Sequence, residues 1–255
     1  MADLPRPSGT ASMTIAGPIV TGANLSDAWL SALRTVRDSP GGDLFHLVTR
    51  IERPLPEDLA IRAAADHLLS SLGHDSVHTV ANTIFPSSLA ATCANADELS
   101  ARYRAMYGRV RVLERSNDGG TYFGRIVAYP ARAENHDQLA TVIGKIQREN
   151  AGRAPKSARY EISVYTPGTD NSIMGFPCLS SCSFQLDRGR LHLVAHYRSQ
   201  YLVQRGYGNY LGLARLQEYI AAQAGVLSGE MTVVAGHARA DAAKYKIAEV
   251  TAALT

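Results

Sequence analysis

A long helix with apolar residues around most of its circumference is the feature that most restricts how this chain can fold. In the run from Tyr210 to Gln223, apolar side chains recur at helical spacing over a wide arc, and Gly225 follows as a candidate cap. A helix with so wide an apolar surface has to be covered on several sides. The run therefore predicts a buried central helix around which the other elements pack.

The rest of the chain mixes predicted strands with predicted helices. Residue patterns predict strands at 43–51, 160–165, 178–186, 191–197 and 230–235, and helices at 25–36, 57–72, 96–105, 139–146 and 238–253. The regular alternation of βαβ units is missing, so the patterns favour an α+β fold with a mixed or antiparallel sheet. We expect one domain over residues 13–255, preceded by a disordered leader at residues 1–12.

Two hairpins and one ambiguous segment complete this prediction. One hairpin pairs residues 109–115 with 121–129 through a glycine-containing turn, and the other joins 178–186 to 191–197. Residues 76–85 are rich in β-branched side chains and are expected to form a strand or an extended link. Trp29, the single tryptophan, lies on the apolar stripe of a predicted helix, which favours core packing over stacking on a ligand.

The net charge and the cysteine content indicate which class of partner the chain binds and which cellular compartment it occupies. The 26 Lys and Arg residues against 23 Asp and Glu give a net charge of +3, so no nucleic acid polymer is expected as a partner. Neither a signal peptide nor an apolar run of about 18 residues occurs, and no membrane association is expected. Three unpatterned cysteines fit a reducing compartment, so we expect a cytoplasmic protein without a metal site.

Cys178, the pair Arg198-Ser199 and Asn209 form the candidate constellation for chemistry. A cysteine thiolate can add to the electron-poor C6 of a pyrimidine and so turn C5 into a nucleophile. Arg198 can lower the thiol pKa and bind a phosphate through its planar fork. The Asn209 amide offers one donor and one acceptor, which match the N3–H and O4 edge of a uracil. A cysteine taken alone is more often a small core residue, and Cys182 is interpreted in that way.

At this spacing, these residues resemble the core of the thymidylate synthase family, which includes pyrimidine nucleotide hydroxymethylases. Further segments resemble family elements in the same order and extend the resemblance over more than half of the chain: Tyr107-Gly108, Asp137-Gln138-Leu139 and the loop from Pro155 to Arg159. The resemblance implies a thymidylate synthase-like domain and a homodimer in which Arg159 reaches the phosphate in the other subunit's site. The implied catalytic residues are Cys178, Tyr107 and Arg198, and the implied substrate-binding residues are Arg159, Ser199, Asn209, Arg239 and Asp241.

Several positions depart from the family pattern where the family contacts folate or the sugar. Tyr201 stands where the family has an aspartate that holds the pterin ring, and Arg205 replaces a nearby glycine. Arg239 and Asp241 replace a histidine and a tyrosine that bind the sugar hydroxyl. The segment that closes over folate in the family is expected to be absent.

Other departures concern the phosphate and proton transfer. Ala158 replaces one of two family arginines, and Leu179 replaces the histidine that follows the nucleophile. Residues 81–85 stand in place of the helix that carries a family glutamate, and they include no carboxylate. The features needed for thiol addition and base reading are therefore better preserved than those needed for folate and deoxyribose.

The matches and departures together predict a pyrimidine nucleotide C5 (hydroxy)methyltransferase-like enzyme that acts through a Cys178 adduct at C6, in specialised nucleoside metabolism. Asn209 favours a uracil base, because cytosine-acting members carry an aspartate there, and the altered sugar positions suggest a ribonucleotide or a modified nucleotide. The resemblance implies 5,10-methylenetetrahydrofolate as the cofactor, whereas Tyr201 and Arg205 argue against it. Two alternatives stay open: a folate-independent reaction or a different substrate with the same adduct, and a noncatalytic nucleotide-binding dimer.

Overall fold

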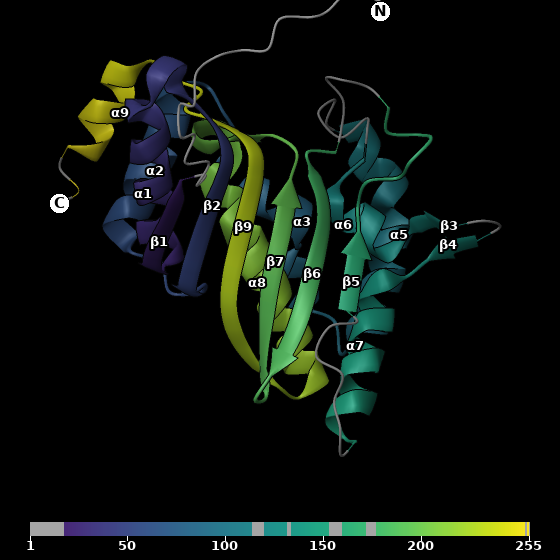
Figure 1. The fold of residues 1–255 in the computed structure, drawn as a ribbon. Coiled ribbons are helices and arrows are strands. Elements are labelled where there is room, and N and C mark those ends of the chain that lie inside the picture. The colour runs from purple at the N-terminus through teal and green to yellow at the C-terminus, as the bar shows by residue number, and fades with distance from the viewer. Residues whose placement is uncertain are drawn as a thin grey trace, which may run out of the picture.

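One mixed sheet organises the computed structural model, which describes residues 18–113, 120–131, 134–152, 160–171, 177–252 and 254 (Figure 1). Its strands are β1 (Ile19–Asn24), β2 (Asp43–Arg53), β9 (Leu227–Arg239), β7 (Arg190–Tyr197), β6 (Leu179–Asp187) and β5 (Tyr160–Ser163) in that spatial order, with β8 (Gln200–Tyr201) also paired to β9. The β1–β2 and β7–β9 pairs are parallel, whereas the β2–β9, β6–β7 and β5–β6 pairs are antiparallel. The predicted α+β class with a mixed sheet is confirmed.

Helices lie behind this sheet and leave the face turned to the viewer without a described helix (Figure 1). They are α1 (Leu25–Asp38), the short η1 (Pro40–Gly42), α2 (Leu59–Ser71), α3 (Val77–Ile84), α4 (Ser87–Ala90), α5 (Ala96–Leu113), α6 (Tyr122–Val127), α7 (Gln138–Asn150), the π-helical η3 (Leu202–Gly206), α8 (Tyr207–Ala224) and α9 (Lys244–Thr251). A second sheet pairs β3 (Tyr129–Ala131) with β4 (Glu134–His136). Within the described residues, no helix has the length and apolarity needed to cross a bilayer.

The predicted central helix is confirmed as α8, which runs across the back of the sheet (Figure 1). Most of its side chains are buried, including Tyr207, Tyr210 and Leu213. The helix ends at Gly225, whose left-handed backbone (φ 72°) is a conformation that glycine adopts without strain. Trp29 on α1 is also buried, and its Nε1 donates to the carbonyl of Leu202 at 2.8 Å, which confirms the core interpretation.

Side-chain caps explain where several helices start. Asp58 accepts hydrogen bonds from the backbone N–H groups of Ala60 and Ile61 at the beginning of α2. Asn24 caps α1 and Asp137 caps α7 in the same way, each through its side-chain oxygen. The caps fix where α1, α2 and α7 begin.

The predicted hairpin of residues 109–115 with 121–129 is wrong, since both of its arms are helical within the described residues. Helix α5 continues from Ala96 to Leu113, and the alternating run that resembled a strand is simply its exposed last part. Thr121 then accepts from the N–H of Gly124 at 3.0 Å and caps α6. The predicted turn falls mostly outside the described residues.

The expectation for residues 76–85 is also wrong. Ser76 accepts from the N–H of Thr79 at 3.2 Å and begins α3. The β-branched residues that suggested a strand instead bury one helical face made of Val77, Val80, Ala81 and Ile84. Packing of that face on α8 outweighs the local strand preference. The predicted leader at residues 1–12 lies outside the described residues.

Two helical glycines offer a direct test of the α3–α8 packing. A Cβ at Gly208 would lie 2.5 Å from the Cβ of Val80, whereas a Cβ at Gly108 in α5 would meet no atom within 4 Å. We expect Gly208→Ala to lower the free energy of unfolding by about 2 kcal/mol through overpacking. The control Gly108→Ala should raise that free energy by about 0.5–1 kcal/mol, because alanine is the better helix former. Urea denaturation measures both changes, and equal effects of the two variants would contradict the packing argument.

Candidate active site

The β6–β7 hairpin brings Cys178 and Arg198 together. Cys178 immediately precedes β6 and Arg198 immediately follows β7, and the backbone N–H of Arg198 donates to the carbonyl of Cys178 at 2.9 Å. Leu179 and Tyr197 are paired in the register next to them. Cys178 is half-buried and packs against the core, while Ser199 follows Arg198 in a half-buried turn. The resemblance implied that Cys178 and Arg198 share a site, and the β6–β7 hairpin brings their backbones together.

Asn209 lies in the first turn of α8 and is only 4% exposed. None of the hydrogen bonds formed among the described residues uses its side-chain amide. Most buried polar side chains have a protein partner. An amide that is buried but unengaged is therefore suited to a ligand that presents a complementary donor and acceptor.

Tyr122, which the sequence analysis missed, is a tyrosine whose hydroxyl lies near Cys178. It is the first residue of α6, and its hydroxyl meets backbone N–H groups of Leu179 and Cys178. Burial, and secondarily the negative charge of an ionised Cys178, raises the pKa of Tyr122, whereas Arg205 and the two N–H groups oppose this rise. The hydroxyl is therefore a neutral donor at physiological pH.

Tyr107, predicted as the catalytic tyrosine, lies instead behind α6. Its hydroxyl accepts from the backbone N–H of Thr121 at 3.1 Å. Its ring contacts Gly124 so closely that an added Cβ there would lie 2.2 Å from a ring carbon. The signal for Tyr122 was present in the sequence, since Tyr122-Phe123-Gly124-Arg125 is a second tyrosine–glycine–arginine pattern.

Arg239 and Asp241, predicted to contact the sugar, use their polar groups within the protein. The carboxylate of Asp241 accepts from the N–H groups of Val203 and Gln204 at 2.8 and 3.0 Å. Burial raises the pKa of Asp241, and these two N–H groups partly offset the rise. Because Val203 and Gln204 belong to η3, Asp241 fixes the segment that leads into α8.

The Arg239 guanidinium pairs with Asp43, from Nε to Oδ1 at 2.9 Å, and lies 5.9 Å from the ring centre of Tyr201. Arg239, Asp241, Asp43 and Tyr201 all line a pocket of about 300 Å³. Among the described residues, neither Arg239 nor Asp241 therefore contacts Cys178, Arg198 or Asn209. Arg159 lies outside the described residues.

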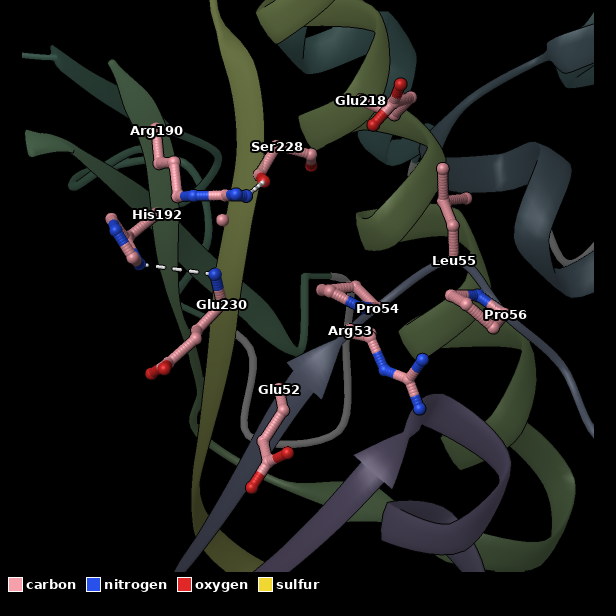
Figure 2. A pocket seen from close by; sticks show the side chains of 11 residues that line it. Glu52, Arg53, Pro54, Leu55, Pro56, Arg190, His192, Glu218, Ser228 and Glu230 are labelled. Atoms are coloured by element: carbon pink, nitrogen blue, oxygen red, sulfur yellow. Dashed lines mark hydrogen bonds between the residues drawn. The ribbon is translucent and has the colours of Figure 1, made fainter. Parts of the chain in front are cut away.

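A pocket of about 440 Å³ lies at the other end of the sheet (Figure 2). Residues at the end of β2 and at the starts of β7 and β9 line it. Among them, His192 Nδ1 accepts a hydrogen bond from the backbone N–H of Glu230 at 3.2 Å. Arg190 donates there to the carbonyl of Ser228 at 3.3 Å. None of the predicted site residues lines this pocket, which separates it from the candidate chemistry.

Comparison with known proteins adds a family match over the part of the chain that holds this constellation. A family model described as thymidylate synthase matches residues 92–249, more than half of the chain. Curated relatives named "Putative thymidylate synthase" include one from Methanosarcina acetivorans, 32% identical over 101 residues, which is 40% of this chain and 44% of the relative. One from Methanothermobacter thermautotrophicus is 28% identical over 129 residues, 49% of this chain and 56% of the relative. The chain therefore spans about half the length of the curated relatives it matches.

Proposed function

This chain belongs to the thymidylate synthase family, and on that premise we propose that it acts on a pyrimidine nucleotide through a covalent adduct between Cys178 and C6. The observation that carries this proposal is the hairpin contact that joins Cys178 to Arg198, and the unengaged amide of Asn209 at the start of α8 supports it. The three residue types suit addition of a thiolate, binding of a phosphate and reading of a pyrimidine edge.

The chemistry follows from electron flow in the ring. The Cys178 sulfur forms a bond to C6, and the electrons of the C5–C6 double bond move toward C5 and O4. Donors to O4 would stabilise the charge that develops there, and we assign that role to the Asn209 amide. C5 then gains a substituent and loses its proton before the C6–S bond breaks. We propose that the neutral Tyr122 hydroxyl, rather than that of Tyr107, lies beside the reacting thiol.

We further propose a homodimer in which Arg159 completes the phosphate site of the partner subunit, with Arg198 and Ser199 binding the same phosphate. Family membership supports this arrangement, and the open face of the sheet gives two copies a surface to share. Activity as a (hydroxy)methyltransferase at C5 in specialised nucleoside metabolism is the reaction that the family suggests.

The residues present do not fit a folate cofactor in the manner expected of the family. The two carboxylates that line the pocket with Tyr201 are Asp43 and Asp241. Asp43 is paired with Arg239 and His237, and Asp241 is bound to backbone N–H groups. In the pocket that Tyr201 lines, neither of the two described carboxylates is left unengaged for a pterin, and we derive no step through folate. This observation favours a second candidate, in which the same adduct labilises C5 without folate-dependent transfer.

Release of tritium from C5-labelled nucleotides tests the proposal and separates the two candidates. We expect release from a uracil nucleotide, tested in ribo and deoxyribo forms. Release that requires added methylenetetrahydrofolate supports transfer, whereas release without it supports labilisation. If no pyrimidine nucleotide releases tritium under either condition, the proposed reaction at C5 is wrong.

A further inference from the structure

Asp241 caps the first turn of a helix to which it does not belong. Its Oδ1 accepts a hydrogen bond from the N–H of Val203 at 2.8 Å, and its Oδ2 accepts one from the N–H of Gln204 at 3.0 Å. These N–H groups lie in the first turn of η3, where a helix offers them no carbonyl of its own. Tyr201, at the N-cap position, contributes no side-chain cap. Asp241, two residues beyond the end of β9, therefore supplies acceptors that the local sequence lacks.

The capped turn is continuous with the helix that carries Asn209. Gly206 (φ −55°, ψ −53°) and Tyr207 (φ −62°, ψ −49°) both have right-handed helical backbones, so η3 passes into α8 without an intervening turn. Asn209 follows three residues after Gly206. A shift of η3 would therefore act on the position of Asn209 through a rigid connection.

The π-helical form of η3 explains why the cap matters. A π turn holds one residue more than an α turn, and such turns are rare and frequently lie at functional sites. Conversion of η3 to an α-helix would turn the preceding chain by about 100° and move it by about 1.5 Å relative to α8. On one side of η3, Tyr201 is paired with Arg239 in the sheet. On the other side, Gly208 of α8 lies so close to α3 that an added Cβ would be 2.5 Å from Val80. Neither side can absorb the change, so the offset between the chain that follows Arg198 and α8 depends on η3.

We propose that Asp241 is a positioning residue: its cap holds η3 in the π-helical form and so sets where the Asn209 amide lies relative to Arg198. A nucleotide bound by its phosphate at Arg198 and by its base at Asn209 needs a fixed separation between these two groups. The inference rests on the proposed function in taking Asn209 as the residue that reads the base. The cap itself does not depend on that function.

Hydrogen–deuterium exchange of the nucleotide-free protein tests whether the cap holds η3. Asp241→Ala removes both acceptors, and the amides of residues 202–206 should exchange about tenfold faster than in wild type. Asp241→Asn keeps one acceptor oxygen and should give a smaller increase, about threefold. Asp75→Ala is the matched control, because Asp75 reaches the same segment through the Arg205 side chain, at 3.6 Å. An exposed pair of this kind contributes little, so that variant should exchange as wild type does.

Calorimetric titration with uridine and deoxyuridine 5′-monophosphate tests whether η3 positions Asn209. We expect Asp241→Ala to raise the dissociation constant of the preferred nucleotide about tenfold and Asp241→Asn to raise it about threefold. The dissociation constant of the matching sugar phosphate, which has no base, should be unchanged in both variants. Alkylation of Cys178 by iodoacetamide, followed by mass spectrometry, should also keep its wild-type rate, because the β6–β7 hairpin holds Cys178 independently of η3. A merely structural role of Asp241 would change all three measurements together.

The outcomes that overturn the inference are distinct from failure of the proposed function. Exchange of residues 202–206 at the wild-type rate in the Asp241 variants overturns it, and so does an equal loss of affinity for the nucleotide and the sugar phosphate. If Asp241→Ala fails to fold, Asp241→Asn alone decides both measurements. If the proposed function is wrong, wild type itself binds neither nucleotide, which removes the role of Asp241 in base reading but leaves the difference in exchange.

Discussion

Cys178→Ala should abolish the covalent adduct between this protein and a 5-fluoropyrimidine nucleotide. Once C5 of the adduct has gained a substituent, a fluorine there cannot leave as a proton does, so the adduct persists long enough to be weighed by intact-protein mass spectrometry. Without the sulfur no other described group near Arg198 offers a comparable nucleophile, since Cys182 is fully buried with a raised pKa. We expect the rate of adduct formation to fall at least ~1000-fold.

The matched control is Cys93→Ala. Cys93 is also free and half-buried, but its Sγ donates to the carbonyl of Leu89, far in sequence from the hairpin. That variant should form the adduct at the wild-type rate. Ribo and deoxyribo nucleotides, each with and without methylenetetrahydrofolate, show which sugar is accepted and whether a carbon is added. An adduct that survives in Cys178→Ala would remove Cys178 from the mechanism.

The sequence predicted the core of the fold because its signals there were long and periodic. The apolar surface of α8 and the β6–β7 hairpin each repeat a physical requirement over several residues. The proximity of Cys178 and Arg198 followed from the same hairpin. In α8 and the β6–β7 hairpin, the local residue pattern allows only one secondary structure, and the tertiary packing requires the same one.

The errors arose where packing decided between two local explanations. The alternating residues at the end of α5 and the β-branched residues of α3 both fit a strand locally. For α3, the deciding factor is the close approach to α8 at Gly208, which no local pattern shows. Tyr107 and Tyr122 both stand shortly before a glycine and an arginine, and only α5–α6 packing shows that the Tyr107 hydroxyl is engaged by the backbone of Thr121.

The contacts of Arg239 and Asp241 also lay beyond the sequence. Both are polar residues near the end of β9 and could equally serve a ligand or the protein. The partner of Asp241 is the backbone of η3, and the partner of Arg239 is Asp43 on β2. These partners are remote in sequence, so only the sheet register and the turn into α8 reveal that the two side chains are occupied.

Asn209→Asp should shift the base preference of the enzyme from uracil toward cytosine. At 4% exposure, the Asn209 amide can donate to O4 and accept from N3–H of a uracil at the same time. An ionised carboxylate can only accept hydrogen bonds. Its negative oxygen would therefore repel O4 of the uracil, and O4 would lose its hydrogen-bond donor. We expect kcat/KM for a uracil nucleotide to fall about 100-fold, because an unmet buried polar contact of this kind costs about 3 kcal/mol. The N4 amine of a cytosine, by contrast, is a donor that the carboxylate can accept.

Activity with the cytosine nucleotide should therefore fall much less than activity with the uracil nucleotide, or rise. Asn209→Ala is the matched control. It removes both the amide donor and the amide acceptor, so kcat/KM should fall by a similar factor for the uracil and the cytosine nucleotide. Alkylation of Cys178 should be unchanged in both variants, which separates base reading from damage to the nucleophile. Equal losses for the two bases in Asn209→Asp would mean that the amide does not read the base. Its burial would then need another explanation, such as a purely steric role at the start of α8.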